Sequence, residues 1–448
     1  MECFFVYFTA NYRLLHWEGG MRKRLKLSLY PGSTVQRRGG LLMQVSQISQ
    51  QPQKQRIEIP IIGGPCDRLT AVLEEFEPGE QEFIIHPQQC GVSPRTVSKV
   101  VEREVEVIVP ARLHMAVLDM NRFSIERVGG GGIGLGIKVY MKARVRSTKK
   151  PEIVVNGERP LIALHFARVF KEILHYPGGF EIELDDHKRR HVGLGSSSGI
   201  MCAVCIGINE ALGRPFNNRE LRRITGYNAC EESPSDNDYI IRTFETGIGS
   251  MVGINGGLVV GSDDAEIIYR APLEDTKVII LIPDVPSLKD EYTGKDTAAD
   301  AEVGLLLRRA RFLDAQLGNP KAHMILLDLL PAAVKGDLKA IGDSLLDISF
   351  TGSKRAECEQ HGMCGAPIFH YIGAFREMGA EAAGMSSVGP TVFALTRKPM
   401  VYERILKYLH DQGISNSRII ETEVDNTGAR IMENNEERNY RDEGWLQG

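Results

Sequence analysis

The chain has 448 residues, of which 42% are hydrophobic and 25% are charged, and its formal net charge is −4. This length suffices for roughly two or three domains with hydrophobic cores, and the slight negative charge excludes a protein that binds nucleic acid through a strongly basic surface. No apolar run is long enough to span a membrane, and the eight cysteines are scattered rather than arranged as a disulfide framework. We therefore expect a cytoplasmic protein without nucleic-acid or membrane partners.

The first hundred residues differ in composition and hydrophobic pattern from the rest of the chain. Residues 1–56 include a Gln/Ser-rich stretch at 44–55, which is typical of poorly ordered chain. Within the remainder, the hydrophobic pattern predicts a strand at 57–62, a helix at 67–76 and a strand at 82–85. We expect residues 1–103 to form a partly disordered N-terminal extension that carries a small α+β module.

Residues 104–274 show strands that alternate with helices. The predicted strands are 105–109, 133–141, 179–184 and 256–261, and the predicted helices are 161–174, 200–207 and 218–227. Pairs of strands followed by helices indicate an α+β domain rather than a doubly wound parallel sheet.

Residues 275–433 form a second pattern of the same kind. Strands are predicted at 277–283, 386–396 and 418–424, and helices at 296–317, 320–346, 367–378 and 401–412. This order is typical of a ferredoxin-like α+β half. Residues 434–448 are expected to be a polar tail.

A Gly/Ser-rich loop is the most informative local feature. It comprises Gly193, Leu194, Gly195, Ser196, Ser197 and Ser198, and it opens directly into the apolar run 200–207. Glycines let the backbone approach a phosphate, and the N-terminus of a helix favours negative charge. Neither the P-loop pattern nor the Rossmann pattern is present, and a tight connection with a Ser N-cap is the alternative.

Two features next to this loop have simple alternative explanations. Lys188 and Arg189 come just before the loop and are candidates for binding phosphate, although a solvated basic hairpin is equally consistent with them. Cys202 and Cys205 form a C-x-x-C within the following apolar run. Since no second Cys/His pair has zinc spacing, we interpret these cysteines as small hydrophobic residues on one helical face.

Three motif segments, at 110–121, 193–199 and 384–390, follow one another on the two predicted halves, and the second and third carry glycines. This arrangement resembles the GHMP kinase superfamily over about residues 104–433. The resemblance implies a two-half α+β fold, with an N-terminal half like ribosomal protein S5, a ferredoxin-like C-terminal half and, here, an extra N-terminal segment. It also implies that Ser386, Ser387 and Gly389 bind phosphate.

One branch of this superfamily is more similar to the chain than the others. Pro110-Ala-Arg-Leu-His-Met115, Leu118-Asp-Met-Asn121 and residues 127–134 are similar to the start of archaeal β-ribofuranosylaminobenzene 5′-phosphate synthases. Further matches lie at 330–335, 384–393 and 425–428. The resemblance implies that 4-hydroxybenzoate or 4-aminobenzoate attacks C1 of phosphoribosyl pyrophosphate, with release of pyrophosphate and CO₂, in methanopterin biosynthesis. Mg²⁺ and a homodimer are implied as well.

The principal alternative is an ATP- and Mg²⁺-dependent kinase of a small sugar or alcohol. Kinases of the superfamily commonly carry a catalytic Asp seven positions before a Gly-Gly pair, and here Gly249 holds that position before Gly256-Gly257. The synthase branch also has glycine there. Without a proton acceptor the phosphoryl transfer is disfavoured, unless Asp236 or Asp238 replaces it. A ligand-binding paralogue without catalysis is the third possibility.

Four residues in or shortly after the first segment are the candidate catalytic residues. Arg112 or Arg127 supplies a planar bidentate partner for the aromatic carboxylate. Asp119 stabilises positive charge at the ribosyl carbon or accepts the phenolic proton, and a turn residue is the alternative. His114 lies two positions after Arg112, so both face one side of a strand, although a core histidine is nearly as consistent.

The chain departs from the synthase pattern at two neighbouring segments. Phe244-Glu-Thr-Gly-Ile-Gly249 stands where the family has R-G-G-T-S-G, and an unusual insertion at 230–238 precedes it. Gly129 also replaces the Asp of the family's V-D-G-G. Because of these departures, the aromatic acid that serves as acceptor can differ from that of the family.

Overall fold

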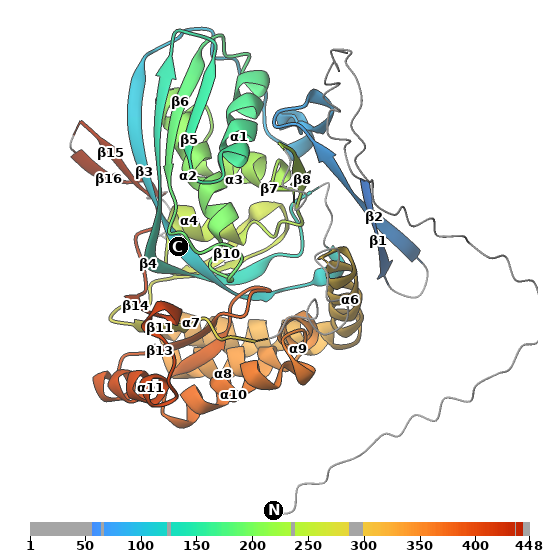
Figure 1. Cartoon of the computed structure of the whole chain (residues 1–448), viewed down its shortest axis with the longest axis vertical. Helices are drawn as coiled ribbons and strands as arrows, with labels where there is room; N and C mark the ends of the chain where they lie inside the picture. Colours follow the sequence, from blue (N-terminus) through green and yellow to red (C-terminus); the bar gives the residue numbers. More distant parts are fainter. Residues whose placement is uncertain are drawn as a thin grey trace, which may run out of the picture. The chain divides into compact units, whose positions relative to one another are not determined.

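A computed structural model describes residues 56–63, 67–122, 127–233, 238–285, 299–434 and 436–441. All of them belong to one compact unit, residues 52–448, which contains two α+β halves (Figure 1). The predictions for residues 1–55 lie outside the described residues.

The N-terminal half is built on a long hairpin of β3 (Arg103–Val117) and β4 (Gly132–Thr148). Its sheet has the order β10-β9-β4-β3-β15-β16, and β6 and β5 extend it from β4. The bounds of the other strands are β5 Ile153–Gly157, β6 Gly179–Asp185, β9 Leu258–Gly261, β10 Ile267–Ala271, β15 Arg430–Glu433 and β16 Glu436–Asn439. The segment expected to be a polar tail therefore contributes β16, and Tyr440 after it is buried.

Helices cover one face of this sheet. Helices α2 (Ser196–Ala211) and α4 (Ile248–Asn255) pack on β3 and β4, while α1 (Pro160–Ile173) packs against α2 and β5; α3 spans Asn218–Tyr227. The first part of β3 alternates buried and more exposed residues, but from Val109 onward most of its residues are buried. Its last part is covered on the second face by the C-terminal half, since Leu113 shares a cluster with Ile280.

The C-terminal half has the ferredoxin-like topology that the sequence predicts. Its four antiparallel strands have the order β12-β13-β11-β14, with helices between β11 and β12 and between β13 and β14. The strands are β11 Lys277–Leu281, β12 Ala382–Met385, β13 Val392–Thr396 and β14 Ile419–Glu423. The helices are α6 Ala299–Met324, α7 Leu330–Lys335, α8 Leu338–Ser349, α9 Gly352–Glu359, α10 Ala366–Glu377 and α11 Pro399–Asp411.

Four predicted elements are wrong. The strand expected at 386–396 is only partly present, because β13 begins at Val392 and the residues before it form a loop that bonds to Gly193 and His114. Residues 67–76 form strand β2 (Asp67–Phe76) rather than a helix, because they pair in antiparallel register with β1 (Arg56–Gly63). The strand expected at 82–85 is replaced by a 3₁₀ turn, Gln81–Phe83. The break expected before Pro320 is absent, since α6 continues through this proline and helical structure ends at Gly336 in a left-handed conformation.

The described part of the N-terminal extension packs on the N-terminal half. Phe76, Ile84, Cys90 and Val92 are buried in the same cluster as the core of that half. Strand β2 also pairs with β8 (Ile240–Arg242), which pairs with β7 (Cys230–Glu232). The insertion at 230–238 thus supplies β7, and β8, which follows the insertion, joins the extension to β7.

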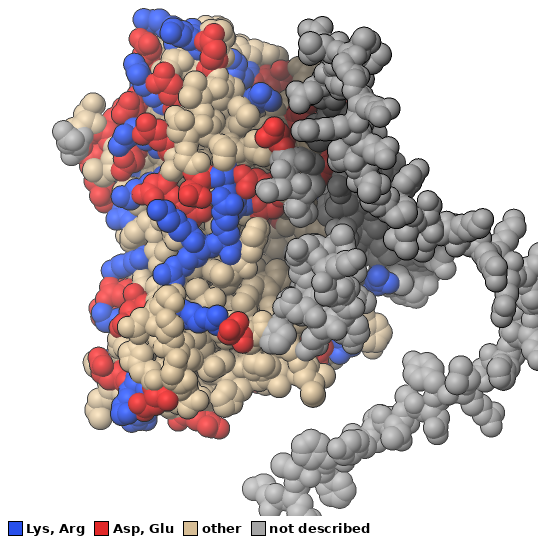
Figure 2. Space-filling view, viewed as in Figure 1, with Lys and Arg blue, Asp and Glu red and all other residues tan. Residues whose placement is uncertain are grey.

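Side chains of opposite charge lie next to one another on the surface. On the face drawn in Figure 2, Lys and Arg side chains stand beside Asp and Glu over much of the surface. On β4, for example, Arg144 pairs with Glu106 and Glu183.

The described cysteines are all free thiols: Cys90, Cys202, Cys205, Cys230, Cys358 and Cys364. None of the helices in the described ranges has both the length and the apolar character needed to cross a membrane.

Candidate active site

The Gly/Ser-rich loop forms the start of α2, as the sequence predicts. Gly193 and Gly195 have φ angles of 97° and 73°, which favour glycine, and Gly195 is the N-cap of the helix. The first backbone N–H groups of a helix have no partner within it, so those of Ser196, Ser197 and Ser198 are available to an anion. Leu194 is buried, and its carbonyl accepts the backbone N–H of Arg112.

The three motif segments meet at this loop. The Ser386 hydroxyl donates to the Gly193 carbonyl at 2.6 Å and accepts the backbone N–H of His114 at 2.9 Å. The Ser387 N–H donates to the His114 carbonyl at 2.7 Å. A Cβ on Gly389 would lie 2.4 Å from the Gly193 nitrogen, so this contact requires glycine. The hydroxyl proton of Ser386 is therefore used to join the two halves.

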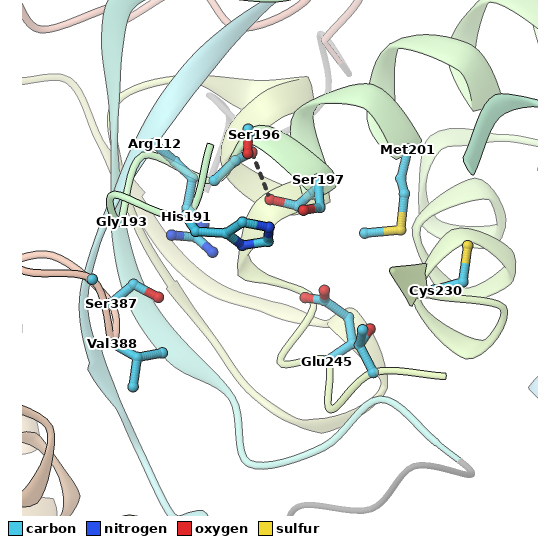
Figure 3. Close-up of a pocket in the computed structure, with 14 residues that line it drawn as sticks. Arg112, His191, Gly193, Ser196, Ser197, Met201, Cys230, Glu245, Ser387 and Val388 are labelled. Atoms are coloured by element: carbon cyan, nitrogen blue, oxygen red, sulfur yellow. Dashed lines mark hydrogen bonds between the residues drawn. The ribbon is translucent and has the colours of Figure 1, made fainter. Parts of the chain in front are cut away.

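A cavity of about 310 Å³ opens beside the loop. Figure 3 shows side chains of β3, of the loop and of the segment after β8 directed into it. Its lining consists of Arg112, His191, Gly193, Gly195, Ser196, Ser197, Ser198, Met201, Cys230, Thr243, Glu245, Ser387, Val388 and Gly389.

Arg112 gives this cavity a positive charge without a direct partner. The Nε and Nη1 atoms of its guanidinium are buried and make no hydrogen bond. Burial lowers the pKa of Arg112, which Glu245 and Glu357 partly oppose. Because an arginine keeps its charge even so, a buried guanidinium without a bonded partner strongly favours an anionic ligand.

His114 lies beneath the cavity rather than in its lining. Its side chain is 7% exposed and its Nε2 has no hydrogen-bond partner. Burial, then the charges of Arg112 and Lys354, hold the pKa of His114 well below its usual value. The imidazole is therefore neutral at physiological pH.

A buried arginine that the sequence analysis did not single out holds the serines of the loop. Arg159 is 2% exposed, and its guanidinium donates to the hydroxyls of Ser196 at 3.2 Å and Ser197 at 2.9 Å. Glu231 on β7 accepts hydrogen bonds from both Arg159 and Ser197. Strand β7 thus fixes the side chains at the start of α2.

The structure explains the glycine at position 249. A Cβ at this position would lie 2.3 Å from the Cβ of Ser198 and 2.6 Å from its Oγ. The close packing of α4 on the start of α2 therefore leaves no room for any side chain, including the aspartate that kinases of the superfamily carry there. Of the two substitutes, Asp238 is exposed and does not line the cavity, and Asp236 lies outside the described residues.

Seven predicted site residues do not line the cavity: Leu194, His114 and Ser386, described above, together with Lys188, Arg189, Asp119 and Arg127. Lys188 is exposed, while the Nη1 of Arg189 is buried without a partner. Asp119 accepts hydrogen bonds from the backbone and the side chain of Asn121, as a turn residue does. Arg127 is exposed and follows residues 123–126, which are outside the described ranges.

The cavity also contains residues that the sequence analysis did not predict. Met201 lies one helical turn after Ser197, so the spacing alone would place both on the cavity side of α2. Glu245 belongs to the segment that departs from the synthase pattern, and this departure was an available signal. No sequence pattern predicts Cys230 or Thr243 as site residues, because only the β7–β8 pairing brings them to the loop.

Comparison with known proteins identifies the family. Residues 162–236 match the family model described as the GHMP kinases N terminal domain. Over 346 residues the chain is 30% identical to β-ribofuranosylphenol 5′-phosphate synthase of Archaeoglobus fulgidus, covering 72% of this chain and 97% of that protein. The chain belongs to the β-ribofuranosylphenol 5′-phosphate synthase family.

A second relative and a solved structure agree with this family. The protein of the same name from Methanothermobacter thermautotrophicus is 26% identical, with 65% of this chain and 89% of that protein covered. Mevalonate diphosphate decarboxylase from Staphylococcus aureus superposes with a TM-score of 0.55 at 15% identity, covering 74% of this chain and 99% of that chain. At this identity it shows a shared fold, and the predicted GHMP-kinase-like α+β fold is confirmed.

Proposed function

We propose that the chain is a decarboxylating phosphoribosyltransferase that joins phosphoribosyl pyrophosphate to 4-hydroxybenzoate and releases pyrophosphate and CO₂, as a step of methanopterin biosynthesis. The observation that carries the proposal is the guanidinium of Arg112, which is buried without a bonded partner beside the N–H groups of the loop. The relatives are named for a ribofuranosylphenol, which favours 4-hydroxybenzoate over 4-aminobenzoate as the acceptor.

The proposed reaction places the pyrophosphate of the donor on the loop. The N–H groups at the start of α2 and the guanidinium of Arg112 stabilise the negative charge that develops as the bond between C1 and pyrophosphate breaks. The ring carbon that bears the carboxylate bonds to C1, and loss of CO₂ then returns the electron pair to the ring. No residue of the protein has to form a covalent bond to either substrate.

Mg²⁺ is expected to arrive with the pyrophosphate. No cluster of three or more metal-binding side chains exists among the described residues, and Glu245 is the carboxylate that lines the cavity there. This composition fits Mg²⁺, which typically uses one or two carboxylates and takes other ligands from phosphate and water. Glu245 is the residue that would hold the ion, which would neutralise charge on the leaving group.

The roles of Asp119 and Arg127 stay predictions, as do those of Lys188 and Arg189. We expect the enzyme to act as a homodimer in the cytoplasm.

Release of ¹⁴CO₂ from carboxyl-labelled 4-hydroxybenzoate tests the proposal. With phosphoribosyl pyrophosphate and Mg²⁺, the chain should release CO₂ and pyrophosphate in equal amounts. ADP formation from ATP and an alcohol, without CO₂, would support the kinase instead. Binding of phosphoribosyl pyrophosphate without turnover of 4-hydroxybenzoate or 4-aminobenzoate would indicate a ligand-binding paralogue.

A further inference from the structure

Val388 presents an exposed apolar side chain to the cavity. It lies between β12 and β13 and is 44% exposed, whereas Met201 and Cys230, the other apolar side chains among the described lining residues, are 4% and 0% exposed. In Figure 3, Val388 and Arg112 lie on one side of the cavity, away from Met201 and Cys230. The cavity therefore has an apolar surface on the same side as its guanidinium.

Three side chains from the C-terminal half fix the backbone around Val388. Lys354 Nζ donates to the carbonyl of Ser387 at 3.1 Å, and Gln360 Nε2 donates to the carbonyl of Val388 at 2.9 Å. His361 Nε2 lies 2.9 Å from the same Val388 carbonyl oxygen. Ser387 has a φ angle of 57°, which residues with a side chain rarely adopt. A single exposed valine is ordinary on a protein surface, but a backbone held in this way is typical of a side chain that a binding site positions in advance.

The residue after Val388 packs on the Gly/Ser-rich loop. A Cβ built on Gly193 would lie 3.6 Å from the Cα of Gly389, so the two backbones are in close contact. The proposed function places pyrophosphate on this loop, and pyrophosphate is bonded directly to C1 of the donor. A ring that rests on Val388 is therefore within reach of the carbon that it attacks.

We propose that Val388 contacts the aromatic ring of the acceptor and selects for an apolar ring, an inference that rests on the proposed function. The phosphates and hydroxyls of the donor require hydrogen-bond donors and charge, which the loop and Arg112 supply. The ring of the acceptor is the apolar part of the two substrates, and packing it on a branched aliphatic side chain removes apolar surface of both from water. A valine side chain neither donates nor accepts a hydrogen bond, so its effect is on the affinity for the acceptor.

Val388→Ala tests this contact, because it removes two methyl groups from an exposed position. The KM for 4-hydroxybenzoate should rise about tenfold, as expected when apolar contact with a ring is lost. The KM for phosphoribosyl pyrophosphate, and the Kd of pyrophosphate measured by calorimetric titration, should change by less than about twofold, since the anion-binding groups are unaltered. Val388→Thr keeps the shape of the side chain and replaces one methyl group by a hydroxyl, so its KM for 4-hydroxybenzoate should rise about threefold.

Val334→Ala is the matched control. Val334 lies on α7, is 68% exposed and does not line the cavity, so this variant loses the same methyl groups elsewhere. It should leave the KM of both substrates within about twofold. The urea midpoints of the Val388 and Val334 variants should equal that of the unaltered chain, because neither side chain is buried.

An unchanged KM for 4-hydroxybenzoate in both Val388 variants would overturn the proposal. A rise confined to the KM for phosphoribosyl pyrophosphate would also overturn it and would assign Val388 to the ribose. Equal rises for both substrates, with weaker binding of pyrophosphate, would refute the contact as well, since the loop would then be displaced as a whole. If the unaltered chain releases no CO₂ from 4-hydroxybenzoate, the proposed function itself fails, and that result is obtained before any variant is made.

Discussion

At the scale of single residues, the guanidinium of Arg112 decides what the cavity can bind. Its buried nitrogen atoms lack partners, so an anion gains charged hydrogen bonds there without displacing existing ones. Arg112→Gln should lower kcat/KM for phosphoribosyl pyrophosphate by about 100-fold or more, which corresponds to about 3 kcal/mol of lost transition-state stabilisation.

Steady-state kinetics and calorimetric titration with pyrophosphate check this expectation. The control is Arg144→Gln, because Arg144 lies half-exposed on β4 and forms ion pairs with Glu106 and Glu183. It should leave both measurements within about twofold. Full pyrophosphate affinity in the Arg112 variant would show that the anion binds elsewhere.

The residues of the site were only partly predictable from the sequence. Arg112 and the loop at 193–198 are found by local motifs, since their chemistry depends on neighbours in the chain. Arg159 and Glu231 are brought to the loop by contacts between segments that are far apart in sequence, since 72 positions separate these two residues. No local pattern contains that information.

At the scale of elements, strand β7 controls the start of α2. Glu231 bonds both Arg159 and Ser197, whereas its neighbour Glu232 reaches the Arg159 Nε at 3.5 Å and the Arg190 Nη1 at 4.0 Å, and bonds neither serine. Glu231→Gln removes the charge that holds Arg159 against the two serines. It should raise the KM for phosphoribosyl pyrophosphate about tenfold and change kcat less, because the loop is displaced rather than the reacting groups.

The matched control is Glu232→Gln, which removes an equal charge from the adjacent residue. It should raise this KM by less than about threefold. A double-mutant cycle with Ser197→Ala measures the coupling between Glu231 and Ser197. Once the serine hydroxyl is removed, the effect of Glu231→Gln on this KM should largely disappear. Additive effects would show that Glu231 does not act through Ser197.

The packing of α4 on α2 gives a second prediction at this scale. In Gly249→Ala the new Cβ would collide with Ser198, so the helices must separate. Overpacking of this kind costs about 1–3 kcal/mol, and the loop should lose pyrophosphate affinity. Gly373→Ala in α10 is the control, since no atom lies within 4 Å of its Cβ position. It should stabilise the fold by up to about 1 kcal/mol.

Urea unfolding and pyrophosphate titration of the two glycine variants provide the comparison. Unchanged pyrophosphate affinity in Gly249→Ala would mean that the start of α2 tolerates a shift.

Most elements were predictable, and the largest failure has a structural cause. Helices α1, α3, α10 and α11 were expected within two residues of their observed bounds, because their hydrophobic periodicity is strong. Residues 67–76 were expected as a helix, but pairing with β1 and β8 overrides local propensity. The role of the extension could not be predicted, since β2 pairs with β8, a strand about 165 residues later in the chain.

At the scale of the whole molecule, the two halves meet at hydrogen bonds rather than only at apolar surface. Ser386 of the C-terminal half is bonded to His114 of β3 and to Gly193 of the loop. The anion site is therefore completed only when both halves are folded and joined. The three motif segments, although distant in sequence, therefore form one site.

Buried neutral histidines distribute an acid sensitivity over the whole fold. Burial lowers the pKa of His165, in α1, to about 3 and that of His361, in the C-terminal half, to about 4. His165 accepts the backbone N–H of Gly79 through Nδ1, and His361 Nε2 lies 2.9 Å from the Val388 carbonyl oxygen. Both contacts suit a neutral ring.

The direction in which stability changes with pH follows from the lowered pKa values of the two histidines. Above about pH 6.5, the usual histidine pKa, neither the folded nor the unfolded chain is protonated, and stability is unaffected. Below that pH the unfolded chain binds protons that the folded chain excludes until its own pKa is reached, so stability falls. Each of these two histidines should cost about 2 kcal/mol between pH 7 and pH 5. In urea denaturation at these two pH values, His361→Gln should lose about 2 kcal/mol less than the unaltered chain. An identical loss in both proteins would show that His361 is not a source of the acid sensitivity.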